Sequence, residues 1–141
     1  MKSKFVAALA IAALMSAGAA RAEIIHFSAT LTGADETPAN TSMGKGQVSA
    51  ELETTEKTLV YRATYTGLSG PAIAAHFHGP ADPGATAPPV VMVGSASSPI
   101  SGAAKLTSAQ ADDLLAGKWY FNIHTQAHPT GEIRGQLKRL N

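Results

Sequence analysis

The chain has 141 residues, of which 45% are hydrophobic and 15% charged, and it contains no cysteine. This length is enough for one domain with a hydrophobic core and too short for two. The lack of cysteine excludes disulfide bonds, thiolate metal sites and a lipid-bearing cysteine.

The first 22 residues predict a secretory signal peptide. A basic start is followed by an apolar run over residues 5–20, which ends at the small-x-small sequence Ala20-Arg21-Ala22. This run is shorter than the roughly 20 residues that a membrane anchor needs. We therefore expect cleavage after Ala22, a mature domain over residues 23–141, a periplasmic or secreted location, and no membrane attachment once the signal is removed.

Removal of this segment changes the net charge. It takes away Lys2, Lys4 and Arg21, which leaves eight of the 11 basic residues against 10 acidic ones, a net charge near −2. A nucleic-acid-binding domain would carry a basic stripe. Nucleic acid is therefore not an expected partner.

Short alternating segments separated by Gly, Pro and Ser follow the signal. Hydrophobic and polar residues alternate from Ile25 to Leu31, and strand-like segments recur near 48–52, 59–65, 73–78, 90–93, 118–125 and 131–138. The pattern predicts an all-β fold, an antiparallel β-sandwich with Greek-key-like connections or a partly closed barrel. One core is expected between two sheets, formed by Phe27, Leu31, Val48, Leu52, Leu59, Tyr61, Ile73, Phe77, Phe121, Ile123, Ile133 and Leu137.

One short helix is expected near residues 108–116. Thr107 and Gln110 have the spacing of a capping box. Leu114 and Leu115 supply the apolar side, and Gly117 is suited to end the helix.

Two of the predicted strands carry histidines on one face. His76 and His78 point to the same side of their strand, with Phe77 opposite, and Asn122 and His124 share a face in the same way. Two imidazoles from one strand and one from another can supply three nitrogen ligands. We expect a site for copper(II), with zinc as the other candidate, because Cu²⁺ precedes Zn²⁺ in the affinity order.

The last two strands extend this polar face. Only residues 126–130 connect them, so they should pair antiparallel. One register suits both strands and pairs His124 with Glu132, Asn122 with Arg134, and Tyr120 with Gln136.

This register makes Glu132, Asn122 and Arg134 candidates to orient an imidazole, and Glu132 could also ligate directly. The alternative for Glu132 and Arg134 is an ordinary cross-strand ion pair. His128 lies in the turn near His124 and is a less favoured candidate.

Other polar residues receive no predicted role. His26 lies on the outward face of the first strand and is expected not to ligate. Asp35 and Glu36 belong to a polar loop, and nothing in the sequence supports a calcium site there.

The chain resembles a chordin-type (CHRD) domain. The matching pieces are Gly67-Leu68, Gly70-Pro71, Ala75-His76-Phe77-His78-Gly79-Pro80, Pro89-Val90-Val91, Leu114-Leu115-Ala116-Gly117, Tyr120-Phe121-Asn122-Ile123-His124-Thr125 and Gly131-Glu132-Ile133-Arg134-Gly135-Gln136-Leu137. The resemblance implies an extracellular β-sandwich, repeated in animal chordin and often a lone secreted domain in bacteria. Residues 83–88 depart from it, being rich in alanine where the family often has a further glycine.

His-x-His on a strand of a secreted β-sandwich is also similar to the copper ligands of Cu/Zn superoxide dismutase. We therefore also expect the predicted β-sandwich to have a superoxide-dismutase-like fold. However, the chain has no recognisable second cluster for zinc and lacks that family's disulfide.

Three functions stay open from the sequence. The leading one is a secreted metal-binding module for Cu(II) or zinc through His76, His78 and His124. The second is a non-catalytic module that binds a periplasmic or extracellular protein without metal, and the third is a dismutase-like copper enzyme. No catalytic motif is present, which favours a protein that is not an enzyme.

Overall fold

The computed structural model describes residue 18 and residues 21–141. The predicted signal peptide over residues 1–22 therefore lies almost wholly outside the described residues. Within the described part of the chain, no helix has the length and apolar character needed to cross a bilayer.

The described residues form nine strands and one helix. In chain order these are β1 (Ile24–Thr32), β2 (Lys45–Glu53), β3 (Thr58–Thr66), β4 (Ala72–His78), β5 (Pro89–Met92), β6 (Ile100–Lys105), α1 (Ser108–Leu115), β7 (Tyr120–Thr125), β8 (Ile133–Gln136) and β9 (Lys138–Arg139). Neighbouring strands follow the order β5-β4-β7-β8-β1-β2-β3-β6, and β9 pairs with β1. β6 and β9 were not predicted.

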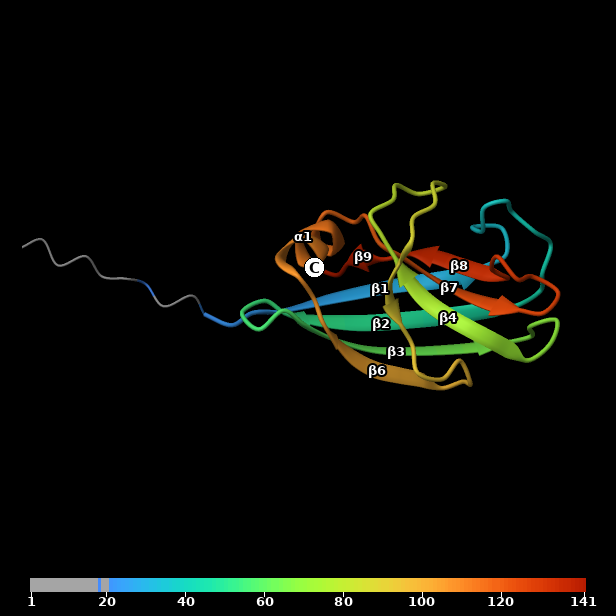
Figure 1. The fold of residues 1–141 in the computed structure, drawn as a ribbon, viewed down its shortest axis with the longest axis horizontal. Helices are drawn as coiled ribbons and strands as arrows, with labels where there is room; N and C mark the ends of the chain where they lie inside the picture. Colours follow the sequence, from blue (N-terminus) through green and yellow to red (C-terminus); the bar gives the residue numbers. More distant parts are fainter. Residues whose placement is uncertain (1–17, 19–20) are drawn as a thin grey trace, which may run out of the picture.

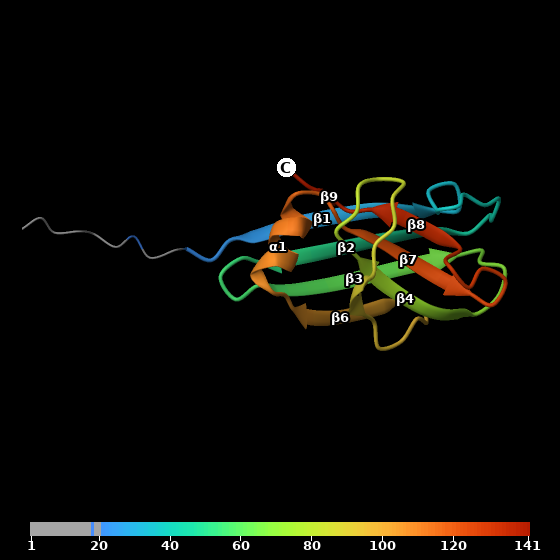
Figure 2. The same ribbon diagram turned by 45° about the horizontal axis from the view of Figure 1, so that its top comes forward.

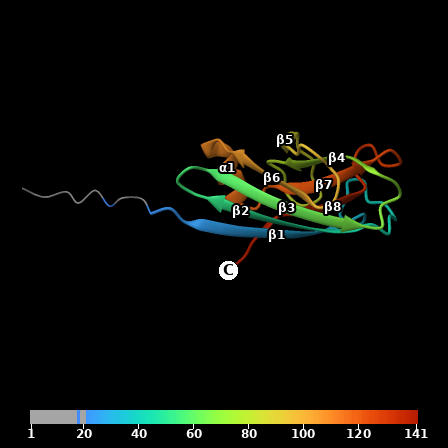
Figure 3. The ribbon, with the colours of Figure 1, turned by 90° about the horizontal axis from the view of Figure 1, so that it is seen from below.

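The strands are arranged in two layers. β1, β2, β3 and β6 form one layer, and β5, β4, β7 and β8 face them from the other (Figures 1 and 3). β1 and β8 share one paired position, Thr32 with Arg134, where the sheet folds over. The predicted all-β antiparallel sandwich is therefore confirmed, with strands distant in sequence side by side.

One hydrophobic core fills the space between the layers. Inward residues alternate with exposed ones along β1, β2 and β3, as a half-buried strand requires. The rings of Tyr61 on β3 and Phe77 on β4 meet across the core with centroids 5.0 Å apart. All of the predicted core residues except Ile73 are buried.

Ile73 corrects the sequence prediction, because its side chain is 60% exposed. The pairing of β4 with β7 shifts register between Ala72 and Ala74. Ile73 sits in this irregularity and has no partner on β7, so the alternation that buries Ala75 and Phe77 does not extend to it.

The predicted helix and its capping box are confirmed. The Thr107 hydroxyl accepts a hydrogen bond from the Gln110 amide (3.1 Å), and the Gln110 side chain accepts one from the Thr107 amide (2.9 Å). Gly117 follows the helix with a φ of 74°, a conformation in which glycine is favoured. Leu114 is fully buried, and α1 covers the end of the sandwich at which β1 begins (Figure 2).

Candidate metal centre

The histidines lie on the outer face of β4 and β7, opposite the core. The loop between β4 and β5, residues 79–88, rises beside this face (Figure 1). Side chains of β7 and β8 bind the loop's carbonyls: the Tyr120 hydroxyl contacts Ala87 O (3.3 Å), and Arg134 Nη2 donates to Ala85 O (2.7 Å). The loop is therefore held against the strands that carry the candidate ligands.

The structure brings His76, His78 and His124 together. Strand pairing places His76 beside Asn122, and His124 lies two residues further along β7. His76 Nδ1 and His124 Nε2 are 3.2 Å apart. One nitrogen from each of the three rings lies within 4.8 Å of the others, which makes this cluster a candidate three-nitrogen site.

The spacing is wider than that of a closed metal site. Ligands bound at about 2.0–2.1 Å in a tetrahedron are about 3.3 Å from one another. The His76–His124 pair already has this spacing, whereas the full set extends to 4.8 Å. Ligation would require side-chain shifts of about 1 Å, which rotation of a half-buried imidazole can supply.

Backbone carbonyls fix which nitrogen of two rings carries the proton. His78 Nδ1 is 2.9 Å from Ala87 O, and His124 Nδ1 is 2.9 Å from Pro129 O. A carbonyl oxygen only accepts, so each Nδ1 must donate. In the neutral rings, Nε2 of both histidines therefore carries a lone pair, the state that a metal ligand needs.

The side-chain oxygen of Asn122 directs a third lone pair toward the Nε2 atoms of His78 and His124. Its Nδ2 donates to Glu36 Oε1 (3.3 Å) and Thr130 O (3.4 Å), which fixes the orientation of the amide. Its Oδ1 then lies 2.9 Å from His78 Nε2 and 3.0 Å from His124 Nε2. With neutral rings, these three atoms face one another with no proton between them, an arrangement that a cation stabilises.

The surroundings favour the neutral imidazoles. Burial lowers the pKa of His76, and the neighbouring His124 and His78 lower it further. Burial also lowers the pKa of His78, although the oxygens of Ala87 and Asn122, which would accept hydrogen bonds from both nitrogens of the protonated ring, act in the opposite direction. Because a metal competes with protons for these nitrogens, lowered pKa values keep them available near neutral pH.

Glu36 belongs to the site and was not found from the sequence. Its side chain is buried at 6% exposure, and burial raises the pKa of its carboxyl group. It contacts Asn122, and a side chain at Gly131 would collide with both residues. The loop before β2 has no periodic pattern, so no sequence signal placed Glu36 beside the histidines.

Arg134 acts on His78 through Tyr120. The Tyr120 ring stacks on His78 with centroids 4.6 Å apart and 3° between the planes. The guanidinium carbon of Arg134, on the next strand, is 3.5 Å from the centre of the Tyr120 ring. Stacking and the cation–π contact hold His78 in place, so Arg134 positions an imidazole indirectly.

The predicted role of Glu132 is wrong. The carboxylate is fully buried and accepts hydrogen bonds from Ser42 Oγ (2.6 Å), Ser69 Oγ (2.7 Å) and Thr125 Oγ1 (2.6 Å). His124 is oriented by a carbonyl instead. β8 begins one residue after Glu132, so the alternation of the strand does not apply to this carboxylate.

The predicted ion pair of Glu132 with Arg134 is likewise not formed. The Arg134 guanidinium donates to Thr37 Oγ1 (3.3 Å) and Ala85 O (2.7 Å), both outside β8.

The two remaining histidines stand apart from the cluster. His128 lies in the turn between β7 and β8, where its backbone exchanges hydrogen bonds with Thr125, and its ring is not part of the cluster. His26 is exposed on β1, with Nδ1 3.4 Å from a Glu51 oxygen.

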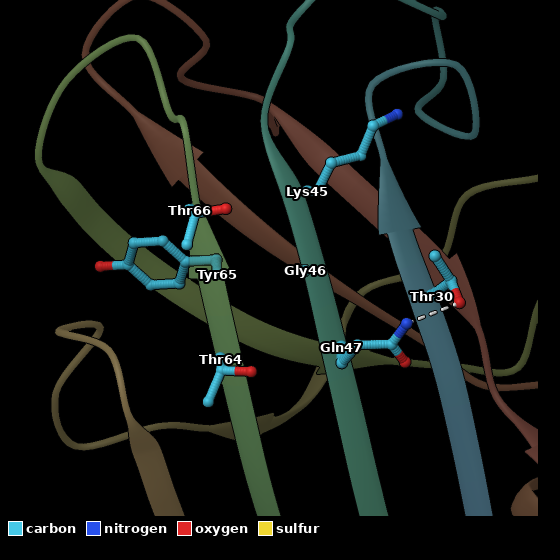
Figure 4. Close-up of a pocket in the computed structure, with 7 residues that line it drawn as sticks. All are labelled: Thr30, Lys45, Gly46, Gln47, Thr64, Tyr65 and Thr66. Carbon is cyan, nitrogen blue, oxygen red and sulfur yellow. Dashed lines mark hydrogen bonds between the residues drawn. The ribbon is translucent and has the colours of Figure 1, made fainter.

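A shallow depression lies on the outer face of the opposite layer, on β1, β2 and β3 (Figure 4). Its lining residues are Thr30, Lys45, Gly46, Gln47, Thr64, Tyr65 and Thr66. The Gln47 side chain donates to Thr30 Oγ1 (3.0 Å), and the other polar groups do not converge on a point. It offers no chemistry comparable to that of the imidazole cluster.

Comparison with known proteins gives a family. The model of the CHRD domain matches residues 27–137, which span β2 to β8, α1 and all of β1 except its first three residues, and which end before β9. No curated protein and no solved structure matches the chain. Because the match spans well over half of the sequence, this chain belongs to the CHRD domain family.

Proposed function

We propose that this protein is a periplasmic or secreted module that binds a divalent cation, Cu(II) in preference to Zn(II), through His76, His78 and His124. The observation that carries the proposal is the meeting of His78 Nε2, His124 Nε2 and Asn122 Oδ1, three lone pairs with no donor among them in the neutral state. A bound cation replaces their mutual repulsion with attraction.

The preference for copper rests on the ligand type. Imidazole serves both metals, and at a given nitrogen site Cu²⁺ binds more tightly than Zn²⁺. In this proposal the predicted signal peptide directs the chain out of the cytoplasm, where it would meet cations held by other extracellular or periplasmic ligands.

The test is to titrate the metal-free mature protein with Cu²⁺ and with Zn²⁺ and to measure the binding by calorimetry. We expect one equivalent of each to bind, Cu²⁺ more tightly. His76→Ala, His78→Ala and His124→Ala should each weaken binding by at least about tenfold, a lower limit taken from the effect of removing groups that only orient ligands.

His26→Ala is the matched control, because His26 is an exposed histidine on the other layer. It should bind as the unaltered protein does. Failure to bind either metal, or binding that is insensitive to all three substitutions in the cluster, would leave a CHRD module that acts by binding a protein partner.

A further inference from the structure

The strand next to the histidines carries a sulfur atom on the same face. β4 and β5 pair His76 with Met92 and Phe77 with Val91. Phe77 and Val91 are both buried in the core. Residues directly opposite in an antiparallel pair point to the same face, so His76 and Met92 share the outer face, with Cβ atoms about 4.5–5.5 Å apart.

Strand pairing extends this arrangement into a row across four strands. Met92, His76, Asn122 and Arg134 are successive neighbours on β5, β4, β7 and β8. His76 therefore lies between the thioether of Met92 and the amide whose oxygen faces the other two imidazoles.

The imidazole cluster is most accessible to solvent on the side where His76 lies. His78 and Asn122 are buried at 7% and 2% exposure, whereas His76 and His124 are half-buried. Met92 is 65% exposed. Its three rotatable side-chain bonds let the sulfur move over the neighbouring imidazole without disturbing the core.

We propose that the same site also binds Cu(I), with the Met92 thioether as an additional ligand beside the imidazoles. This inference rests on the proposed function, because it takes the three histidines as the primary ligands. A thioether is a soft ligand and favours Cu(I), whereas Cu(II) and Zn(II) are held well by imidazole alone. Met92 should therefore contribute to binding of Cu(I) and little to binding of the divalent ions.

The chain offers a matched control. Met43 and Met92 are the two methionines of the predicted mature protein, and Met43 is 82% exposed in the loop before β2, at a position not paired with β4. Met92→Leu and Met43→Leu each remove one sulfur and nearly conserve side-chain volume. They differ in the distance of that sulfur from the imidazoles.

The experiment compares these variants with the unaltered protein. Cu(I) affinity is measured without oxygen by competition with a chromophoric Cu(I) chelator, and Cu²⁺ and Zn²⁺ affinities by calorimetry. Met92→Leu should weaken Cu(I) binding by at least about tenfold, since loss of a ligand should exceed the lower limit for loss of an orienting group. It should change the divalent affinities by less than about threefold, and Met43→Leu should change none of them.

A second measurement uses the unaltered protein. Hydrogen peroxide converts an accessible methionine to its sulfoxide, and ligation of the sulfur should slow this reaction. With Ag(I) as a redox-inert substitute for Cu(I), peptide mass spectrometry should show Met92 protected and Met43 oxidised at its metal-free rate.

The outcomes separate the two proposals. Cu²⁺ binding through the histidines, with Cu(I) affinity unchanged in Met92→Leu or Met92 unprotected by Ag(I), would overturn the role of Met92 and leave the proposed function standing. Failure of the unaltered protein to bind any of these ions would overturn both.

Discussion

The amide of Asn122 decides what the centre of the site offers to a ligand. An amide presents either an acceptor or a donor, according to which way it is turned. Glu36 accepts from the nitrogen of this amide, so the oxygen faces His78 and His124. A buried carboxylate that contacts no imidazole nitrogen thereby makes the centre suitable for a cation.

Glu36→Gln should weaken metal binding without removing a ligand. A glutamine at this position can donate to Asn122 Oδ1, which allows the amide to turn and present its NH₂ group to the two Nε2 atoms. In the metal-free protein, the two Nε2 atoms would then accept hydrogen bonds from the turned Asn122 amide. We expect Cu²⁺ affinity to fall about 10–100-fold, the range for groups that orient ligands, as measured by calorimetry.

Asp35→Asn is the control for this substitution. It removes one negative charge from the same loop, and the Asp35 carboxylate interacts with Thr32 at the exposed surface. A similar loss of affinity in both variants would mean that loop charge, not the orientation of Asn122, controls binding.

At the scale of elements, Glu132 joins three segments that are distant in sequence. Its carboxylate accepts hydrogen bonds from Ser42 before β2, from Ser69 between β3 and β4, and from Thr125 at the end of β7. Burial alone would raise the pKa of Glu132, but the hydrogen bonds outweigh it and lower the pKa to about 2.

This pKa predicts a stability loss in acid. The folded protein binds the Glu132 proton less tightly than the unfolded chain, whose pKa is near 4.5, so the stabilisation is complete above that pH. It is lost as the pH falls from about 4.5 to 2 and amounts to about 3 kcal/mol. Urea unfolding of Glu132→Gln should show lower stability at pH 7 and a weaker pH dependence in this window.

Glu51→Gln tests whether any carboxylate would behave this way. Glu51 is exposed on β2, and its replacement should leave both the stability at pH 7 and the acid dependence close to those of the unaltered protein. An acid-induced loss that persists unchanged in Glu132→Gln would assign it to other groups.

The positions of Asn122 and Glu132 show how much of the candidate site could be predicted from the sequence pattern of the strands. The period of two placed His76 and His78 on one face, and the predicted register correctly paired Asn122 with Arg134 and Tyr120 with Gln136. Glu132 lies outside the paired strand, where the period no longer applies.

The missed features lack a local signal. β6 has Gly102, Ala103 and Ala104 at its centre, and these small residues give no hydrophobic alternation. Glu36 enters the site from a loop that folds against the β7–β8 turn, a contact that depends on tertiary packing.

At the scale of the whole molecule, β1 begins two residues after Ala22, the expected last residue of the signal peptide. The Glu23 amide donates to Thr54 Oγ1 (3.2 Å), and the Thr54 amide donates to the Glu23 carbonyl (3.0 Å). Arg21 and Ala22 are exposed and precede β1. Cleavage after Ala22 would therefore leave β1, which starts at Ile24, complete.

We predict a mature protein that starts at Glu23. Intact-mass measurement of the exported form should give the mass of residues 23–141. Ala22→Phe places a bulky residue where the cleavage site needs a small one, so the uncleaved form should accumulate. An exported protein that keeps Met1 would contradict the prediction.

The two strands that carry the histidines also determine when a metal could first be held. His76 and His124 are 48 positions apart in the chain and meet only when β4 pairs with β7. A precursor that crosses a membrane unfolded has no assembled site and cannot carry a cytoplasmic cation with it. If the chain is exported before it folds, as the predicted signal peptide implies, the compartment in which it folds would select the ion that the proposed site binds, and the order of export and folding would become part of the selectivity.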